Sequence, residues 1–148
     1  MRSNVICIFL FMGLAAAFPA TGEIQTFNFK ASSYFIPNEM LDWYQSGHAC
    51  KAVGFELVSV ETQEEDEFIL SIIRPFNESF WTSGNDLYKE GEFYWESTGQ
   101  LMGPYFNWVG PPNLGDGQRC VRYQLQYDLL WDNESCQYLS RIVCEKAS

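Results

Sequence analysis

The sequence has little positive charge and almost no histidine. Its 9 Lys and Arg residues face 19 Asp and Glu residues, which gives a net charge of −10, and His48 is the single histidine. An acidic surface gains nothing from phosphate backbones or anionic lipids, so nucleic acid is excluded as a preferred partner. The sequence contains no Ser-His-Asp spacing, phosphate-binding loop or H-E-x-x-H motif, and His48 is expected to be a structural histidine on a helix face. A binding protein is therefore predicted, and not an enzyme.

Long hydrophobic runs are also missing after the first twenty residues. Residues 1–20 contain Arg2, an apolar run over 5–17 and small residues near a possible cut, which is the pattern of a removable signal peptide cleaved between positions 17 and 22. The apolar run is too short to form a membrane-spanning helix. We therefore expect a secreted, extracellular protein of one domain, with no membrane insertion.

The cysteines predict disulfides and leave no spare thiol. One of the five, Cys7, leaves with the signal peptide, and the rest are Cys50, Cys120, Cys136 and Cys144. In an oxidising compartment this even set predicts two disulfides, with three pairings open, and zinc is disfavoured because no C-x-x-C pair occurs. Without a heptad repeat or an unpaired cysteine, a monomer or weak dimer is expected.

Two helices are expected in the first half of the chain. The first is predicted to begin at an Asn38 cap and to stop at Gly54, with a buried face formed by Leu41, Tyr44, His48 and Ala52. The second is predicted to begin at Thr62, which forms a capping-box pattern with Glu65, and its buried stripe is Ile69, Ile72 and Ile73. Its acidic first turn, residues 64–67, is expected in solvent beside the positive end of the helix dipole.

Strands are expected in the second half. From Ser79 onward, short aromatic and aliphatic runs alternate with Gly, Pro, Asn and Asp. Helices followed by strands predict an α+β fold, in which helices pack against a largely antiparallel sheet. The stretch GPPNLGDGQ, residues 110–118, has no periodicity and is expected to be a surface loop, where ligand-binding groups tend to lie.

The order of several motifs resembles that of a C-type lectin-like domain, particularly the secreted single-domain lectins of insects. The motifs are Cys50, ELVSVETQEEDEF, FWTSG, FYWESTG, NWVGPPN, QRCV, WDNESC and RIVCEK, and the match covers residues 26–146. The resemblance implies two helices packed on a mostly antiparallel sheet, an irregular long loop, and the disulfides Cys50–Cys144 and Cys120–Cys136. It also implies a calcium ion that binds sugar hydroxyls directly, because calcium accepts six to eight oxygen ligands.

The family's calcium site is altered in this sequence. The family has Glu-Pro-Asn, then a Glu two residues before a cysteine, then Trp-Asn-Asp; the matched positions here are 111–113 (Pro-Pro-Asn), Gln118 and 131–133 (Trp-Asp-Asn). The resemblance therefore implies metal-binding and carbohydrate-binding roles for Asn113, Gln118, Asp132 and Asn133, and a cis peptide bond before Pro112. Only Asp132 is a carboxylate, and the loss of two carboxylates at about 1.4 kcal/mol each weakens calcium binding roughly a hundredfold. Calcium is expected to be a weakly held cofactor.

Two N-glycosylation patterns begin at Asn77 and Asn133, and a glycan on Asn133 would stand where a sugar is expected to dock. Asn113 is similar to the mannose-type arrangement, but Pro111 lacks the acceptor that completes it, so mannose or fucose is only weakly preferred over galactose. The expected function is a secreted carbohydrate-binding lectin whose partners are glycans or glycoproteins. The alternative is a calcium-independent C-type lectin-like module that binds a protein or lipid.

Overall fold

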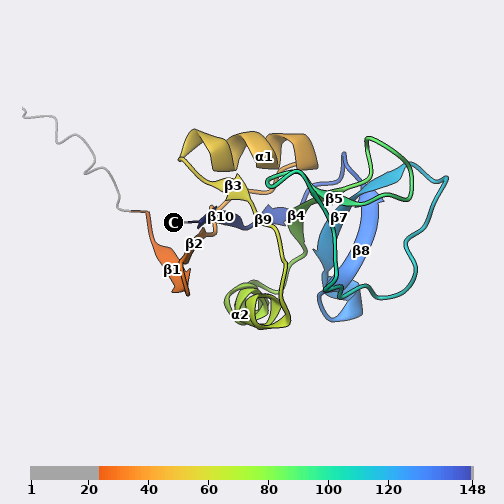
Figure 1. The fold of residues 1–148 in the computed structure, drawn as a ribbon. Helices are drawn as coiled ribbons and strands as arrows, with labels where there is room; N and C mark the ends of the chain where they lie inside the picture. The colour runs from red at the N-terminus through yellow and green to blue at the C-terminus, as the bar shows by residue number, and fades with distance from the viewer. Residues whose placement is uncertain (1–23, 148) are drawn as a thin grey trace, which may run out of the picture.

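The computed structural model describes residues 24–147, so the predicted signal peptide and its cleavage site lie outside the described residues. Within that range the two α-helices are α1 (Trp43–Ala52) and α2 (Gln63–Ile73), and two single turns of 3-10 helix are η1 (Arg74–Phe76) and η2 (Leu125–Tyr127). The helices lie on opposite sides of the strands, α1 above and α2 below in Figure 1.

The first sheet brings the two ends of the described chain together. Its strands are β1 (Thr26–Phe29), β2 (Ser32–Phe35), β3 (Glu56–Leu57) and β10 (Cys144–Ala147). Their spatial order is β1-β2-β10-β3 and all pairs are antiparallel. Because β10 lies between β2 and β3, the last strand joins the first hairpin to the chain that leaves α1.

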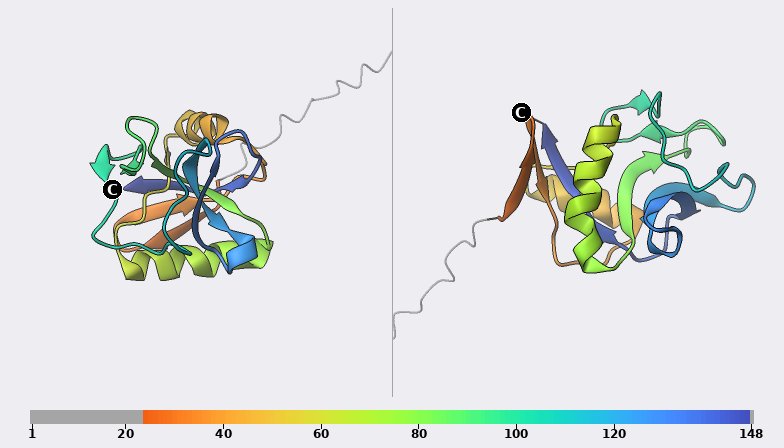
Figure 2. Two further views of the ribbon diagram at one scale, coloured as in Figure 1. Left: turned by 90° about the vertical axis from the view of Figure 1, so that its right-hand side faces the viewer. Right: turned by 90° about the horizontal axis from the view of Figure 1, so that it is seen from below.

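The second sheet carries the long loop. Its strands are β4 (Phe80–Asn85), β5 (Tyr94–Trp95), β6 (Gln100–Leu101), β7 (Gln118–Gln124), β8 (Leu130–Ser135) and β9 (Arg141–Ile142). The order is β6-β5-β4-β7-β8, and β9 pairs with β4 in parallel. Residues 102–117, which we call the long loop, connect β6 to β7 at the end of the molecule farthest from β1 (Figures 1 and 2).

Helix α1 begins four residues later than the sequence predicts. Its N-cap is Asp42, which accepts a hydrogen bond from the backbone N–H of Gln45, while the Gln45 side chain accepts one from Asp42 in return. The chain just before the cap is extended, because Leu41 exchanges two backbone hydrogen bonds with Ser140 at 2.9 and 3.0 Å. The expected start at Asn38 is therefore wrong.

The buried face of α1 also differs from the expectation. Trp43, Ser46 and Cys50 face the core, whereas Tyr44 is 49% exposed and His48 is exposed. Starting the helix at residue 43 rotates the inward stripe, since side chains three to four residues apart share a face. The expectation that Tyr44, His48 and Ala52 form the buried face of this helix is therefore wrong.

Helix α2 follows the prediction at its start and along its apolar stripe. The Thr62 hydroxyl accepts from the backbone N–H of Glu65 at 3.2 Å, and Ile69 and Ile73 are fully buried. The Glu65 carboxylate, however, accepts from the backbone of Glu61 at 2.9 Å, so the reciprocal half of the capping box is shifted by one residue. Glu65 and Asp66 are 8% and 1% exposed. The expectation of a solvated acidic turn is wrong at these two positions, because tyrosines from other elements donate to both carboxylates.

The α+β fold with two helices, mostly antiparallel strands and two disulfides is confirmed. Cys50 pairs with Cys144 and Cys120 with Cys136, with Cα–Cα distances of 5.5 and 5.2 Å. In the chain-entropy account these links stabilise the fold by about 4.6 and about 3 kcal/mol, because the first closes a much longer loop. The centre of the larger core is Trp131, on which four rings pack edge-on: Trp95, Tyr105, Trp108 and Tyr123.

Candidate functional site

The long loop lies against β8 over its first half. The backbone N–H of Trp131 donates to the carbonyl of Asn107 at 2.8 Å, and that of Val109 donates to the carbonyl of Trp131 at 2.9 Å. Trp108 is half-buried between Phe93 and Trp131, with ring centroids at 5.1 and 6.0 Å. These contacts make residues 107–109 an irregular extra strand beside the sheet, which fixes where the rest of the loop begins.

A buried carboxylate on α2 supports the same part of the loop. Asp66 accepts hydrogen bonds from the Tyr105 hydroxyl at 2.7 Å, the Asn107 amide at 2.7 Å and the Tyr123 hydroxyl at 2.6 Å. Burial and the bond to Asp66 raise the pKa of Tyr105, and burial together with the Asp66 charge raises the pKa of Tyr123. Both phenols therefore remain donors at physiological pH. No pattern in the sequence indicates this role, since an acid in a first helix turn is usually a solvated dipole partner.

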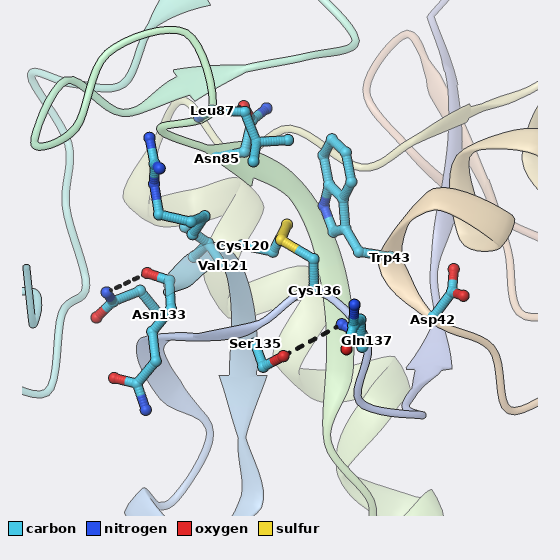
Figure 3. Close-up of a disulfide and its surroundings, with 12 residues drawn as sticks. Asp42, Trp43, Asn85, Leu87, Cys120, Val121, Asn133, Ser135, Cys136 and Gln137 are labelled. Carbon is cyan, nitrogen blue, oxygen red and sulfur yellow. Dashed lines mark hydrogen bonds between the residues drawn. A yellow bond between two sulfur atoms is a disulfide. The ribbon is translucent and has the colours of Figure 1, made fainter. Parts of the chain in front are cut away.

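Asn133 connects the far end of the loop to β8. This residue is 0% exposed, on the same side of β8 as Trp131. Its Oδ1 accepts from the backbone N–H of Asn113 at 3.0 Å, and its Nδ2 donates to the carbonyls of Asn113 at 2.5 Å and Gln118 at 2.7 Å. Figure 3 shows Asn133 among the residues around the Cys120–Cys136 disulfide, with one of its hydrogen bonds dashed.

Asn113 and Gln118 face each other on the surface of the loop. The exposed Asn113 side chain donates from Nδ2 to Oε1 of Gln118 at 3.2 Å. Gln118 begins β7, and the next residue, Arg119, holds that strand in place through an ion pair at 2.6 Å with the buried Asp86. The structure therefore brings three of the four site residues suggested by the sequence into one hydrogen-bonded group.

Asp132 contacts this group through the backbone. Its Oδ1 accepts from the N–H of Asn133 at 3.0 Å, and in the β7–β8 register it stands opposite Arg122. Burial raises the pKa of Asp132, the nearby charge of Glu134 adds to the rise, and the Asn133 hydrogen bond and Arg122 oppose it. A partly buried carboxylate with a raised pKa is a weaker ligand for a cation than a cluster of fully ionised carboxylates.

The donor set as arranged does not fit a calcium ion. Calcium takes six to eight oxygens with several carboxylates among them, and Asp132 is the single carboxylate at the matched positions. Asn133 already uses its amide oxygen and both amide hydrogens, and Oε1 of Gln118 accepts from Asn113. Over residues 24–147 the structure contains no group of three or more His, Cys, Asp or Glu side chains that could hold a metal.

An apolar hollow adjoins the loop. Its lining residues are Gly91, Glu92, Phe93, Leu101, Met102, Phe106, Trp108 and Pro112. Pro112 places this hollow next to Asn113, and Phe106 at its edge is 50% exposed. The cis peptide bond expected before Pro112 is wrong, since the cis bond found within the described range is Gly103–Pro104.

The described residues form two helices around two sheets, with two disulfides and a long loop hydrogen-bonded to β8. The sequence matches the lectin C-type domain family over residues 39–146. The chain belongs to this family. It is 34% identical over 122 residues to the low affinity immunoglobulin epsilon Fc receptor of Mus musculus, a match that covers 80% of this chain and 35% of the receptor. It is 26% identical over 127 residues to the C-type lectin mosGCTL-7 of Aedes aegypti, covering 78% of this chain and 84% of that protein.

The fold is also similar to solved carbohydrate-recognition domains. The cow domain of CD23, determined in the presence of a GlcNAc2Man3 oligosaccharide, superposes with a TM-score of 0.72 and 29% identity over 83% of this chain and 93% of that one. The chain spans only 30% of the length of several CD209 antigens that it matches. No helix in residues 24–147 has the length and apolar character that a membrane span requires.

Proposed function

We propose that this chain is a secreted, non-enzymatic lectin that binds glycans or glycoproteins at the surface formed by Asn113 and Gln118. The single observation that carries the proposal is the exposed pair of amides, held together at 3.2 Å on a loop that Asn133 fixes to the sheet. Membership of the family and the relative studied with an oligosaccharide support it. Secretion is proposed from the leader-like first twenty residues.

The chemistry of the amide pair suits a sugar diol. With Asn113 Nδ2 bonded to Gln118 Oε1, the pair presents an acceptor, Asn113 Oδ1, and a donor, Gln118 Nε2. Vicinal hydroxyls can satisfy both groups, and the exposed ring of Phe106 in the adjoining hollow offers an apolar surface to the sugar face. Pro111 supplies no side-chain oxygen, so mannose or fucose is favoured over galactose only weakly. Any calcium response is weak and rests on Asp132.

Loss of the amide pair is expected to weaken glycan binding. The double variant Asn113→Ala, Gln118→Ala removes about two hydrogen bonds, so binding on a glycan array should fall about tenfold or more. Gln63→Ala, which changes an exposed amide on α2, serves as the matched control and should bind as the wild type does. Arrays are run with calcium and with chelator. Binding that survives the double variant would place the glycan site elsewhere.

An alternative function is a calcium-independent module for a protein or lipid partner. The observation that favours it is the apolar surface of the long loop, where Phe106, Val109 and Leu114 are 50%, 40% and 54% exposed. Exposed apolar side chains on one loop are more typical of a protein or lipid contact than of a sugar contact. This alternative would be supported over the lectin by two results together. The glycan array would show no binding with calcium or with chelator, and a pull-down would recover a partner whose binding depends on these three residues.

We further propose that the chain carries a glycan at Asn77 and none at Asn133. Asn77 is exposed after η1, whereas both amide hydrogens of the buried Asn133 donate to backbone carbonyls. Glycosidase treatment of the secreted protein should lower its mass by one glycan, and Asn77→Gln should abolish that mass shift. Ser135→Ala, which removes the second acceptor pattern, is the control and should leave it unchanged. A mass shift caused by Ser135→Ala would show that Asn133 is modified.

A further inference from the structure

The inward amide of Asn133 bonds the long loop at Asn113 and the first residue of β7 at Gln118. The residue is separated by 20 positions from Asn113 and by 15 from Gln118, and it bonds backbone atoms of both. Its two amide hydrogens reach two carbonyl oxygens, and its oxygen accepts the Asn113 N–H. A primary amide has two donor hydrogens, so the donor capacity of this side chain is fully used. We call this set of three hydrogen bonds the Asn133 link.

The link consists of short hydrogen bonds in a protected place. Asn133 is 0% exposed, and the Cys120–Cys136 disulfide joins β7 to the chain just after β8. Water therefore competes poorly for these bonds, and leaving their donors unpaired would cost more than at the surface. The bonds go to the backbone of Asn113, so the position of that residue is fixed whatever its side chain does.

We infer that the Asn133 link performs the structural task of a metal ion at this site: it closes the loop over residues 113–118 and presents the Asn113 and Gln118 amides without calcium. The inference concerns loop order and holds whether or not the loop binds a glycan. It follows from two observations: the side chains at the matched positions do not fit calcium, and the Asn133 amide already bonds Asn113 and Gln118.

The loop can be closed either by the amide of residue 133 or by a bound cation, and the identity of residue 133 decides which. A carboxylate of the same shape accepts hydrogen bonds but has none to donate. In Asn133→Asp, the carbonyls of Asn113 and Gln118 would face a negative oxygen in place of N–H groups. Such a cluster repels itself unless a cation lies among its oxygens, and with Asp132 adjacent it begins to resemble a calcium site. In Asn133→Asp, the loop is therefore expected to close only when a cation is bound, whereas in the wild type the Asn133 amide closes it.

Hydrogen exchange on the unmodified protein tests the inference without any variant. The backbone N–H of Asn113 donates to Asn133 Oδ1 at 3.0 Å, so it should exchange at least about tenfold more slowly than a free loop amide. The rate should be the same in chelator and in excess calcium. Fast exchange in chelator that calcium slows would overturn the inference, because the ion would then be closing the loop.

Limited proteolysis of variants gives the second test. Chymotrypsin can reach Phe106 and Leu114, which are 50% and 54% exposed, only if the loop opens enough to enter the protease. Asn133→Asp should be cut there at least about tenfold faster than wild type in chelator, the change expected from about 1.4 kcal/mol of lost closure, and calcium should slow the cutting. Wild type should be cut slowly in both conditions.

Asn113→Ala is the matched control, because it removes a proposed glycan contact but keeps the backbone N–H and C=O that Asn133 bonds. It should be cut at the wild-type rate. If Asn133→Asp is as resistant as wild type in chelator, the inference is wrong. If it does not fold, the exchange measurement on wild type decides. A protein that binds no glycan but passes both tests would defeat the proposed function and leave this inference standing.

Discussion

Replacement of Asp66 by alanine is expected to lower the free energy of unfolding by about 3–5 kcal/mol, because each donor left without its acceptor costs about 1–3 kcal/mol when buried and less when half-buried. The carboxylate accepts from Tyr105, Asn107 and Tyr123, and it is 1% exposed. Its removal leaves the buried Tyr123 hydroxyl and the half-buried Tyr105 and Asn107 donors without this acceptor, and the cost of each unpaired donor rises with its burial. Urea denaturation followed by tryptophan fluorescence measures the loss.

Glu67→Ala is the matched control for Asp66→Ala. Glu67 follows Asp66 in α2 but is exposed, and it accepts from the side chain of Gln63 at 2.8 Å. Its removal should change stability by less than about 0.5 kcal/mol, as is typical of surface positions. Asp66→Asn should fall between the two, since an amide oxygen can still accept some of the bonds. A loss below about 1 kcal/mol for Asp66→Ala would show that the network does not carry the support of the loop.

Acidification from about pH 8 to about pH 5 is expected to stabilise the protein, opposite to the behaviour of a domain held by ionised carboxylates. Burial, and then the charge of Glu65, raise the pKa of Glu145 from 4.5 to about 7. Burial likewise raises the pKa of Glu65. The two carboxyl groups lie where α2 meets the first sheet, and Glu61 adds a third negative charge.

The direction of this pH dependence follows from the raised pKa of Glu145. A carboxyl group whose pKa is higher in the folded than in the unfolded state binds its proton more tightly when folded, so folding is favoured at low pH. The advantage is complete below about pH 4.5 and disappears as the pH rises toward 7. At about 1.4 kcal/mol for each pKa unit, the difference across this window is on the order of 2–3 kcal/mol. Chemical denaturation at several pH values measures it.

Glu145→Gln isolates the contribution of this group. The amide keeps the shape of the side chain and can still accept from Ser32, whose hydroxyl bonds Glu145 at 3.0 Å. We expect the variant to be more stable than wild type at about pH 8 and nearly equal at about pH 5, so that most of the pH dependence is lost. Glu39→Gln, at an exposed position, controls for the change in net charge. Equal pH dependence in Glu145→Gln and wild type would contradict the assignment.

Much of the fold follows from local patterns. The even set of cysteines, the strand-like runs after Ser79 and the order of family motifs predict an α+β domain with two disulfides, and the structure has that fold and both bonds. These features can be read because each depends on residue types and short spacings, which the sequence displays directly. The same motifs pointed to Asn113, Gln118 and Asn133, which lie together in the structure.

Other features depend on residues far apart in the chain. The start of α1 is set by Leu41 pairing with Ser140, and the burial of Asp66 by tyrosines 39 and 57 positions away. In the sequence, Asn133 looks like a surface acceptor for a glycan or a metal, but its amide bonds Asn113 of the long loop and Gln118 of β7, which are 20 and 15 residues earlier. The sequence by itself determined the family and the fold, and it indicated the region of the candidate site. Only the tertiary structure decided which polar groups are already paired, because hydrogen-bond partners are chosen by distance in space and sequence periodicity records only neighbours along the chain.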